Sequence, residues 1–229
     1  EHSGYGGRSG YNTQTEPVQI DDLMIEPTDV MTGGGNQSRF LYYQLKMSMM
    51  RAKQIDIIVS FLMESGVRMI LNDIRAALER GAKVRILTGN YLGITQPSAL
   101  YLIKKELGDQ VDLRFYHDKG RSFHPKSYIF HYENMEEIYI GSSNISRSAL
   151  TSGIEWNYRF NSLADHKNFQ MFYRTFEELF FYHSIIVDEE ELRRYSKNWH
   201  KPAVSRDIAR YDDFEEGADT KVEVFFQPR

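Results

Sequence analysis

The chain has 229 residues, of which 41% are hydrophobic and 26% are charged, the balance of an ordinary globular protein. It has no cysteine, which excludes disulfides, thiolate metal sites and a cysteine nucleophile. No apolar run is long enough for a membrane span or a secretory signal. The formal net charge is −4, so any positive charge that binds a nucleic acid must be local.

Residues 1–36 predict a flexible N-terminal arm, because they are rich in Gly, Ser and Thr and show no apolar periodicity. Its end, Gly33-Gly34-Gly35, could cradle a phosphate, but without the lysine of a phosphate-binding loop it favours a plain turn. Ser38 is a candidate N-cap for a helix over 38–53, where apolar residues recur at helical spacing.

The next segment alternates between strand and helix patterns. Strands are predicted over 55–61, 83–88 and 111–116, and helices over 66–80 and 97–107. This order with short connections predicts an α/β fold with a mixed, mainly parallel sheet flanked by helices on both faces. The domain is expected to span 37–197.

Three further strand patterns cover 126–132, 138–140 and 154–160, and two helices follow over 165–182 and 188–197. The first of these helices carries an aromatic stripe at helical spacing, which favours core or dimer interface over a base-stacking platform. The stripe consists of Phe169, Phe172, Phe176, Leu179 and Phe180. After the second helix, residues 198–229 are predicted to form a linker.

Three short segments pair polar residues two positions apart, so each pair lies on one face of extended backbone. A histidine, a lysine, an amide and a hydroxyl directed at one point would bind a phosphate, and a carboxylate would fix the imidazole tautomer. The pairs are His124 with Lys126, Ser142 with Asn144, and Glu155 with Asn157.

The His-x-Lys pattern also occurs at His117 and Lys119. Only the second occurrence, at His124, is followed by an apolar strand and then by Gly-Ser-x-Asn, so we favour it. Taken one at a time, these segments favour an exposed strand edge, a turn with a helix cap and a surface carboxylate. Their order and spacing together favour a shared site.

Positive charge gathers around these segments. Arg114, Lys119, Arg121 and Lys126 outnumber Asp118 between residues 114 and 126, and Arg147 follows the Gly-Ser-x-Asn turn. Such a local cluster suits a nucleic-acid backbone, whereas the alternative is a solvated loop. Lys119, Arg121 and Arg147 are therefore candidate substrate-binding residues, and Asn157, paired with Glu155 in the third segment, is a further candidate.

The ordered set of His124, Lys126, Ser142, Asn144 and Glu155 resembles the signature of the phospholipase D superfamily, in particular its short nucleases with one motif per chain. The resemblance covers about residues 38–182. It implies that His124 attacks a phosphodiester to form a phosphohistidine, and that Lys126, Asn144 and Ser142 hold the phosphate. Glu155 would orient His124, with Asn157 assisting. It also implies no metal or cofactor, and a homodimer with the equivalent histidine of the second chain as acid.

One position departs from that pattern, because His131 stands where the family often has a structural aspartate. A narrower resemblance links the runs at 83–93, 122–130 and 140–157 to phospholipase D-like domains fused to bacterial superfamily 2 helicases. The ending KVEVFFQPR is similar to the approach to such a helicase core. No Walker A motif is present in the chain itself.

The sequence thus predicts a cytoplasmic, metal-independent phosphodiesterase acting on DNA, with RNA as an alternative substrate. A second hypothesis is a catalytically silent DNA-binding or dimerisation module. A third is a lipid phosphodiesterase, against which count the single motif and the lack of an amphipathic membrane segment. Strand preference and sequence specificity are not predicted.

Overall fold

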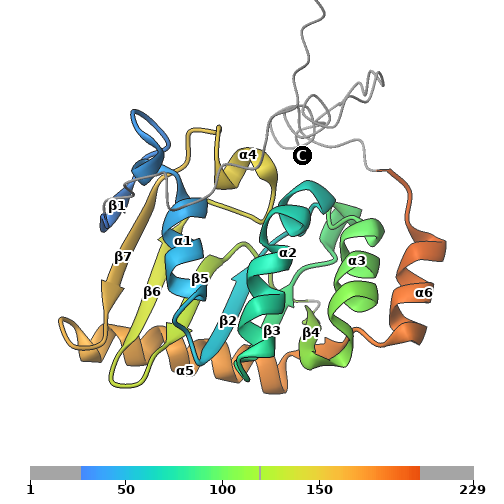
Figure 1. Ribbon diagram of the computed structural model, residues 1–229. Coiled ribbons are helices and arrows are strands. Elements are labelled where there is room, and N and C mark those ends of the chain that lie inside the picture. The colour runs from blue at the N-terminus through green and yellow to red at the C-terminus, as the bar shows by residue number, and fades with distance from the viewer. Residues whose placement is uncertain (1–26, 119, 202–229) are drawn as a thin grey trace, which may run out of the picture.

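The computed structural model describes residues 27–118 and 120–201. The predicted arm over 1–26, the tail from 202 and Lys119 lie outside the described residues. Figure 1 shows a single sheet with helices on both of its faces. The strands are β1 (Val30–Met31), β2 (Gln54–Val59), β3 (Lys83–Thr88), β4 (Val111–Tyr116), β5 (Lys126–His131), β6 (Glu136–Gly141), β7 (Asn157–Asn161) and β8 (Ser184–Ile186). The helices are α1 (Leu41–Met49), α2 (Glu64–Glu79), α3 (Pro97–Leu107), α4 (Arg147–Leu150), α5 (His166–Tyr182) and α6 (Glu189–Asn198), with 3₁₀ turns η2 (Gln37–Arg39), η3 (Tyr91–Gly93) and η4 (Gly108–Gln110).

The strand order is β1-β7-β6-β5-β2-β3-β4-β8. Within the described ranges, β3 pairs in parallel with β2 and with β4, and the other five neighbouring pairs are antiparallel. The predicted mixed α/β sheet is confirmed, but the expectation that it is mainly parallel is wrong. Short connections such as residues 132–135 can join only antiparallel neighbours, whereas a parallel pair needs a crossover helix.

The helices form two unequal layers. On one face, α1, α2, α3, α4 and α6 cover a large apolar core, and on the other face α5 crosses the strands alone (Figure 1). Three buried rings of α5 fill the smaller core, where they pack with side chains such as Ile58, Leu87 and Ile129. Helices therefore flank both faces, as predicted. The three rings are Phe169, Phe176 and Phe180.

The start of the fold lies earlier than predicted. Val30 and Met31 form an edge strand that pairs antiparallel with β7, so the predicted arm over 1–36 is too long. Ser38 does not cap α1, because the N-cap position of that helix is Phe40. The backbone nitrogen of Ser38 donates to Asn36 Oδ1 at 3.1 Å. This bond begins the η2 turn, and α1 starts only at Leu41.

The end of the fold lies later than predicted. Trp199, placed in the predicted linker, donates from its indole Nε1 to the carbonyl oxygen of Gly93 at 2.6 Å. Tyr195 of α6 likewise donates from its hydroxyl to the carbonyl oxygen of Thr95 at 2.5 Å. These two bonds tie α6 to the connection between β3 and α3.

Candidate active site

The three polar segments predicted from the sequence lie together at one edge of the sheet. Lys126 begins β5 opposite Val59, the last residue of β2. On the other side of β5, β6 ends at Gly141, opposite Asn157 at the start of β7. Because β2, β5, β6 and β7 all end or begin at this edge, residues far apart in sequence become neighbours there. We call it the site edge.

His124 reaches this edge just before β5. Its backbone is held on both sides, because the buried ring of Phe123 stacks on Tyr116 at a centroid distance of 4.5 Å and Pro125 accepts a bond from Ser60 Oγ at 3.3 Å. The imidazole is exposed and meets Phe61 edge-on at 6.5 Å between centroids. In the described part of the chain it makes no hydrogen bond, so both ring nitrogens are accessible.

Lys126 is partly buried beside His124, and its Nζ donates to the carbonyl oxygen of His124 at 2.9 Å. Burial lowers the pKa of the Lys126 ammonium, and the negative charge of Glu155 opposes that shift. The ammonium still has further N–H donors. It can therefore hold a phosphate oxygen close to the imidazole.

Ser142, just after β6, and Glu155, just before β7, contact each other at the site edge. The hydroxyl of Ser142 hydrogen-bonds the Glu155 carboxylate, and the backbones of Ser142 and Trp156 are joined at 3.1 Å. Burial raises the pKa of the Glu155 carboxyl, against the opposing effects of Ser142 and Lys126. The contact predicted between Glu155 and His124 is absent among the described residues, and Glu155 binds Ser142 instead.

Asn144 is oriented from the opposite strand. Its Oδ1 accepts from the backbone nitrogen of Phe61, just beyond β2, at 3.1 Å. The loop that carries it is fixed by Met63, whose nitrogen donates to Ile145 at 2.9 Å, and by Gly66, where a Cβ would lie 2.4 Å from the backbone of Ile145. Because the amide oxygen is occupied, the Nδ2 protons remain for a ligand.

Asn157 lies behind the site rather than in it. Its side chain is buried and donates from Nδ2 to Ser143 Oγ at 2.9 Å, and the hydroxyl of Tyr128 donates to the carbonyl oxygen of Ser143 at 2.9 Å. Asn157, predicted to contact substrate, therefore supports the loop that holds Ser142 and Asn144.

The predicted basic cluster is divided by the fold. Arg121 and Arg147 are exposed, close in sequence to His124 and Asn144 respectively. Arg114 is not available, because its Nε and Nη2 donate to Asp112 at 2.9 and 3.1 Å and its Nη1 donates to the carbonyl oxygen of Phe180 at 3.1 Å. Its guanidinium also lies 4.3 Å from the ring centroid of Phe180. Positive charge at the site edge comes from Lys126, Arg121 and Arg147.

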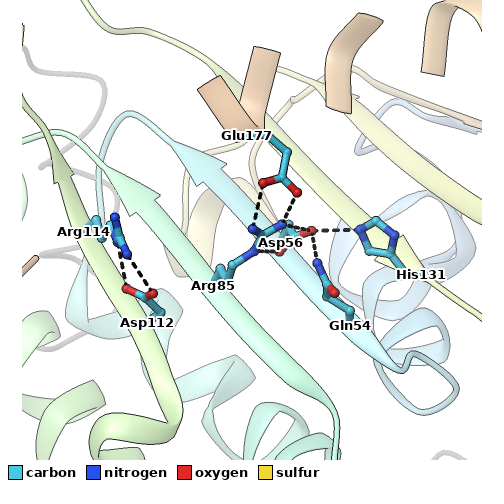
Figure 2. Close-up of polar contacts among 7 residues, drawn as sticks. All are labelled: Gln54, Asp56, Arg85, Asp112, Arg114, His131 and Glu177. Atoms are coloured by element: carbon cyan, nitrogen blue, oxygen red, sulfur yellow. Dashed lines mark hydrogen bonds and ion pairs between the residues drawn. The ribbon is translucent and has the colours of Figure 1, made fainter. Parts of the chain in front are cut away.

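A second polar cluster lies deeper in the sheet, beneath α5 (Figure 2). Asp56 of β2 is fully buried and binds Arg85 of β3 at 2.6 and 3.0 Å and His131 of β5 at 2.8 Å. Arg85 also binds Glu177 of α5 through two bonds of 3.1 Å. The cluster thus joins three strands to the helix that covers them, and His131 belongs to it rather than to the site.

The comparisons with known proteins agree with this architecture. A family model described as cardiolipin synthase, PLD-like domain, matches residues 45–180. Nuc from Salmonella typhimurium, a phospholipase D family member, is 19% identical with a TM-score of 0.53, and the match covers 72% of this chain and all of Nuc. NucT from Helicobacter pylori is 17% identical with a TM-score of 0.45, covering 60% and 85% of the two chains. Among curated proteins no sequence matches.

A larger protein contains a similar fold. Polyphosphate kinase from Porphyromonas gingivalis is 15% identical with a TM-score of 0.53, and the match covers 85% of this chain but 29% of the kinase. No helix within 27–118 and 120–201 has the length and apolar character needed to cross a membrane.

Proposed function

Because the chain belongs to the phospholipase D-like domain family, we propose that it is a phosphodiesterase that cleaves DNA through a phosphohistidine intermediate. One observation carries the proposal: an exposed imidazole, His124, stands at a sheet edge beside the ammonium of Lys126 and the oriented amide of Asn144. A nucleophile between two phosphate-binding donors is the arrangement that phosphoryl transfer needs.

The first step forms a bond between a ring nitrogen of His124 and phosphorus while the bond from phosphorus to the leaving oxygen breaks. His124 of the partner subunit gives its proton to that oxygen. In the second step that histidine takes a proton from water, the resulting hydroxide attacks phosphorus, and the nitrogen–phosphorus bond breaks. Lys126 and Asn144 hold the non-bridging oxygens throughout, so the developing charge is met by fixed donors.

Ser142 and Glu155 serve this chemistry as a pair. The Glu155 carboxylate binds the Ser142 hydroxyl and supports the charged form of Lys126. In this proposal Glu155 acts through Lys126 and Ser142, and not through a direct hydrogen bond to His124.

DNA is the proposed substrate because exposed basic side chains flank the site. Arg121 precedes His124 by three residues, and Arg147 begins α4 just after Asn144. Neither points to a particular base, so they favour contacts with the backbone of the nucleic acid. Such contacts make binding weaker as salt rises.

A homodimer would bring two copies of His124 together, since one chain supplies one histidine of the proposed pair. The exposed apolar side of α5 is one candidate surface, but it lies towards the other end of the strands. The outward side of this helix exposes Met171 at 61% and Tyr182 at 81%, with Phe172 and Phe181 also exposed. An apolar face of this kind commonly marks an interface. Through Glu177 and Tyr173, α5 packs on Arg85 and His131, at the end of the strands away from the site edge, so contact through this face does not by itself bring two copies of His124 together.

Sedimentation tests the dimer. The wild type is expected to sediment as a dimer. Met171→Glu combined with Tyr182→Glu on α5, and Tyr101→Glu on the exposed side of α3, are both expected to stay dimeric and active. A wild-type protein that sediments as a monomer and still cleaves DNA would refute the shared site.

Cleavage of plasmid and single-stranded DNA in EDTA tests the activity, with the wild type beside His124→Ala. Nicking that the variant lacks supports the proposal. Cleavage that survives the substitution would reject His124 as the nucleophile. No cleavage by either protein, with salt-sensitive DNA retention, would favour a silent DNA-binding module.

The proposed helicase context rests on the resemblance of the runs at 83–93, 122–130 and 140–157 alone. In it, the domain would act on DNA in the cytoplasm beside a motor that opens the duplex. The mass of the intact protein isolated from its source cells would test this context, because a helicase fusion predicts a mass far above the 26.9 kDa of these 229 residues.

A further inference from the structure

Two exposed aromatic side chains stand at the site edge, one on each side of His124. Trp156, immediately before β7, is 72% exposed, and Tyr91, in the connection after β3, is 58% exposed. In the strand order, β7 and β3 each lie two strands away from β5. Neighbouring strands lie about 4.8 Å apart, so the backbone that carries each ring lies roughly 10 Å from the start of β5, measured along the site edge.

Trp156 is held by its backbone while its ring stays free. Its nitrogen donates to Ser142 Oγ at 3.0 Å, and its carbonyl oxygen accepts from the Ser142 nitrogen at 3.1 Å. Its neighbours on either side are Glu155, which binds Ser142, and the buried Asn157. Because the backbone of Trp156 is already fixed, stacking its exposed indole on a flat partner loses little conformational entropy.

The connection that carries Tyr91 is anchored in the same way. Thr95 Oγ1 donates to the carbonyl oxygen of Gly89 at 2.6 Å, and the Trp199 indole donates to Gly93 at 2.6 Å. Between these anchors Leu92 has a φ of 55° and is 64% exposed. A left-handed leucine is strained, and such strain persists where surrounding contacts impose it, often at ligand contacts.

Polar and charged groups separate the two rings. His124, Lys126 and Ser142 lie between them along the edge, with Arg147 just beyond Asn144. A protein partner would be expected to meet a continuous apolar patch, as α5 offers. Isolated aromatic rings beside cationic groups are instead the arrangement that binds unpaired bases along a charged backbone.

We infer that Trp156 and Tyr91 are stacking platforms for unpaired bases on either side of the scissile phosphate, so the site takes single-stranded nucleic acid in preference to duplex. This inference rests on the proposed function, since it places a phosphodiester at His124. In a duplex the base faces are occupied by neighbouring pairs, so neither ring could stack without unpairing.

Binding is measured in the His124→Ala background, so that no cleavage intervenes and the result does not depend on whether the chain is catalytic. The probes are a single-stranded oligothymidylate, a duplex of equal length and a single strand of equal length built from abasic units. The abasic strand keeps the backbone charge and removes the bases. We expect the oligothymidylate to bind most tightly of the three.

Trp156→Ala and Tyr91→Ala, each added to that background, are expected to weaken oligothymidylate binding by roughly five- to a hundredfold and to weaken abasic binding much less. Tyr101→Ala, the same kind of change on α3, is the matched control and should bind as the parent does. Oligothymidylate should also quench tryptophan fluorescence, and Trp156→Phe should remove most of that quenching.

Equal affinity for the oligothymidylate and the abasic strand would overturn the inference, because backbone charge alone would then explain binding. So would tighter binding of the duplex. If Trp156→Ala instead dissociates the dimer and DNA affinity falls only with dissociation, Trp156 belongs to the subunit interface and the inference is rejected. Failure of the cleavage assay in EDTA would count only against the proposed reaction and not against the stacking of bases on Trp156 and Tyr91.

Discussion

The side-chain Oδ1 of Asn144 lies 3.1 Å from the backbone nitrogen of Phe61, a residue 83 positions earlier in the chain. A backbone N–H can only donate, so it fixes which end of the amide faces it. The Nδ2 group is left to face a ligand. The end of β2 therefore prepares a hydrogen-bond donor at the site edge before any substrate arrives.

Replacing Asn144 by Asp separates the two ends of this side chain. A carboxylate still accepts from Phe61, so we expect the melting temperature to change little. It can no longer donate to a phosphate oxygen, and it adds a repelling charge. We expect kcat/KM for DNA cleavage to fall by about a hundredfold or more, measured beside circular dichroism melting. Wild-type activity in the variant would show that the amide does not contact the phosphate.

Glu155 and Lys126 are coupled through their charges, and this predicts a change in the pH profile. Burial lowers the pKa of Lys126, and the Glu155 charge raises it again. In Glu155→Gln the opposing charge is gone, so Lys126 loses its proton at a lower pH. We expect the alkaline limb of kcat/KM against pH to move to lower pH.

Ser142→Ala provides the comparison for that experiment. The Ser142 hydroxyl lowers the pKa of Glu155, against the raising effect of burial. Without it the Glu155 pKa rises, so an acid limb set by Glu155 should move to higher pH while the alkaline limb moves less. If Glu155→Gln leaves the alkaline limb in place, either Glu155 does not control Lys126 or Lys126 does not set that limb.

The elements best predicted from sequence are those closed by local signals. The boundaries of β3, β4 and α3 agree with the prediction, because Gly81 and Gly108 interrupt the chain at positive φ beside them. The run from 154 to 160 was misleading, because Ile154 and Trp156 are exposed and β7 begins only at Asn157. From the sequence alone, exposed apolar residues at the site edge cannot be distinguished from the buried apolar residues of a strand.

Contacts across the sheet could not be predicted in this way. His131 departs from the family pattern, yet no local feature of the sequence indicates that it meets Asp56, which precedes it by 75 residues. That pairing follows from the register of β2 against β5. The bond from Phe61 to Asn144 has the same origin. The spacing of His124 and Lys126, and of Ser142 and Asn144, predicted only that each pair shares one face of an extended segment.

The buried Asp56 cluster predicts an acid-sensitive fold. Burial alone would raise the pKa of Asp56, but hydrogen bonds and charge from His131 and Arg85 outweigh it and leave the pKa lowered. Stability from Asp56 is thus fully present above the pKa of an unfolded aspartate and is lost as pH falls through the lower folded value. Urea unfolding from neutral to acidic pH should show this loss, and Asp56→Asn should flatten it.

Asp56→Ala should lower the free energy of unfolding more than Asp56→Asn does. Asp56→Ala leaves the largely buried guanidinium of Arg85 with Glu177 as its remaining carboxylate partner. We expect the free energy of unfolding at neutral pH to fall by about 3 kcal/mol or more. Arg114→Ala, which breaks the more exposed pair with Asp112, should cost about 1 kcal/mol or less. Equal losses in the two variants would contradict the structural role assigned to the cluster.

The glycine run at 33–35 gives a matched pair of substitutions that tests how the Glu155 loop is positioned. Gly33 has a φ of +71°, and a Cβ there would lie 2.4 Å from the carbonyl oxygen of Gly153 and 3.2 Å from the Glu155 nitrogen, whereas a Cβ on Gly34 would meet nothing within 4 Å. Gly33→Ala should therefore displace the loop that carries Glu155 and lower stability by about 1–3 kcal/mol.

Gly34→Ala should change neither stability nor cleavage, although it alters the same run of glycines. If the run instead bound a phosphate through its backbone, both substitutions would weaken DNA binding to a similar degree. Thermal melting and cleavage measured on the two variants side by side distinguish these cases. A loss of cleavage in Gly33→Ala alone, accompanied by a shifted pH profile, is expected because Glu155 then no longer stands beside Lys126 as it does in the wild type.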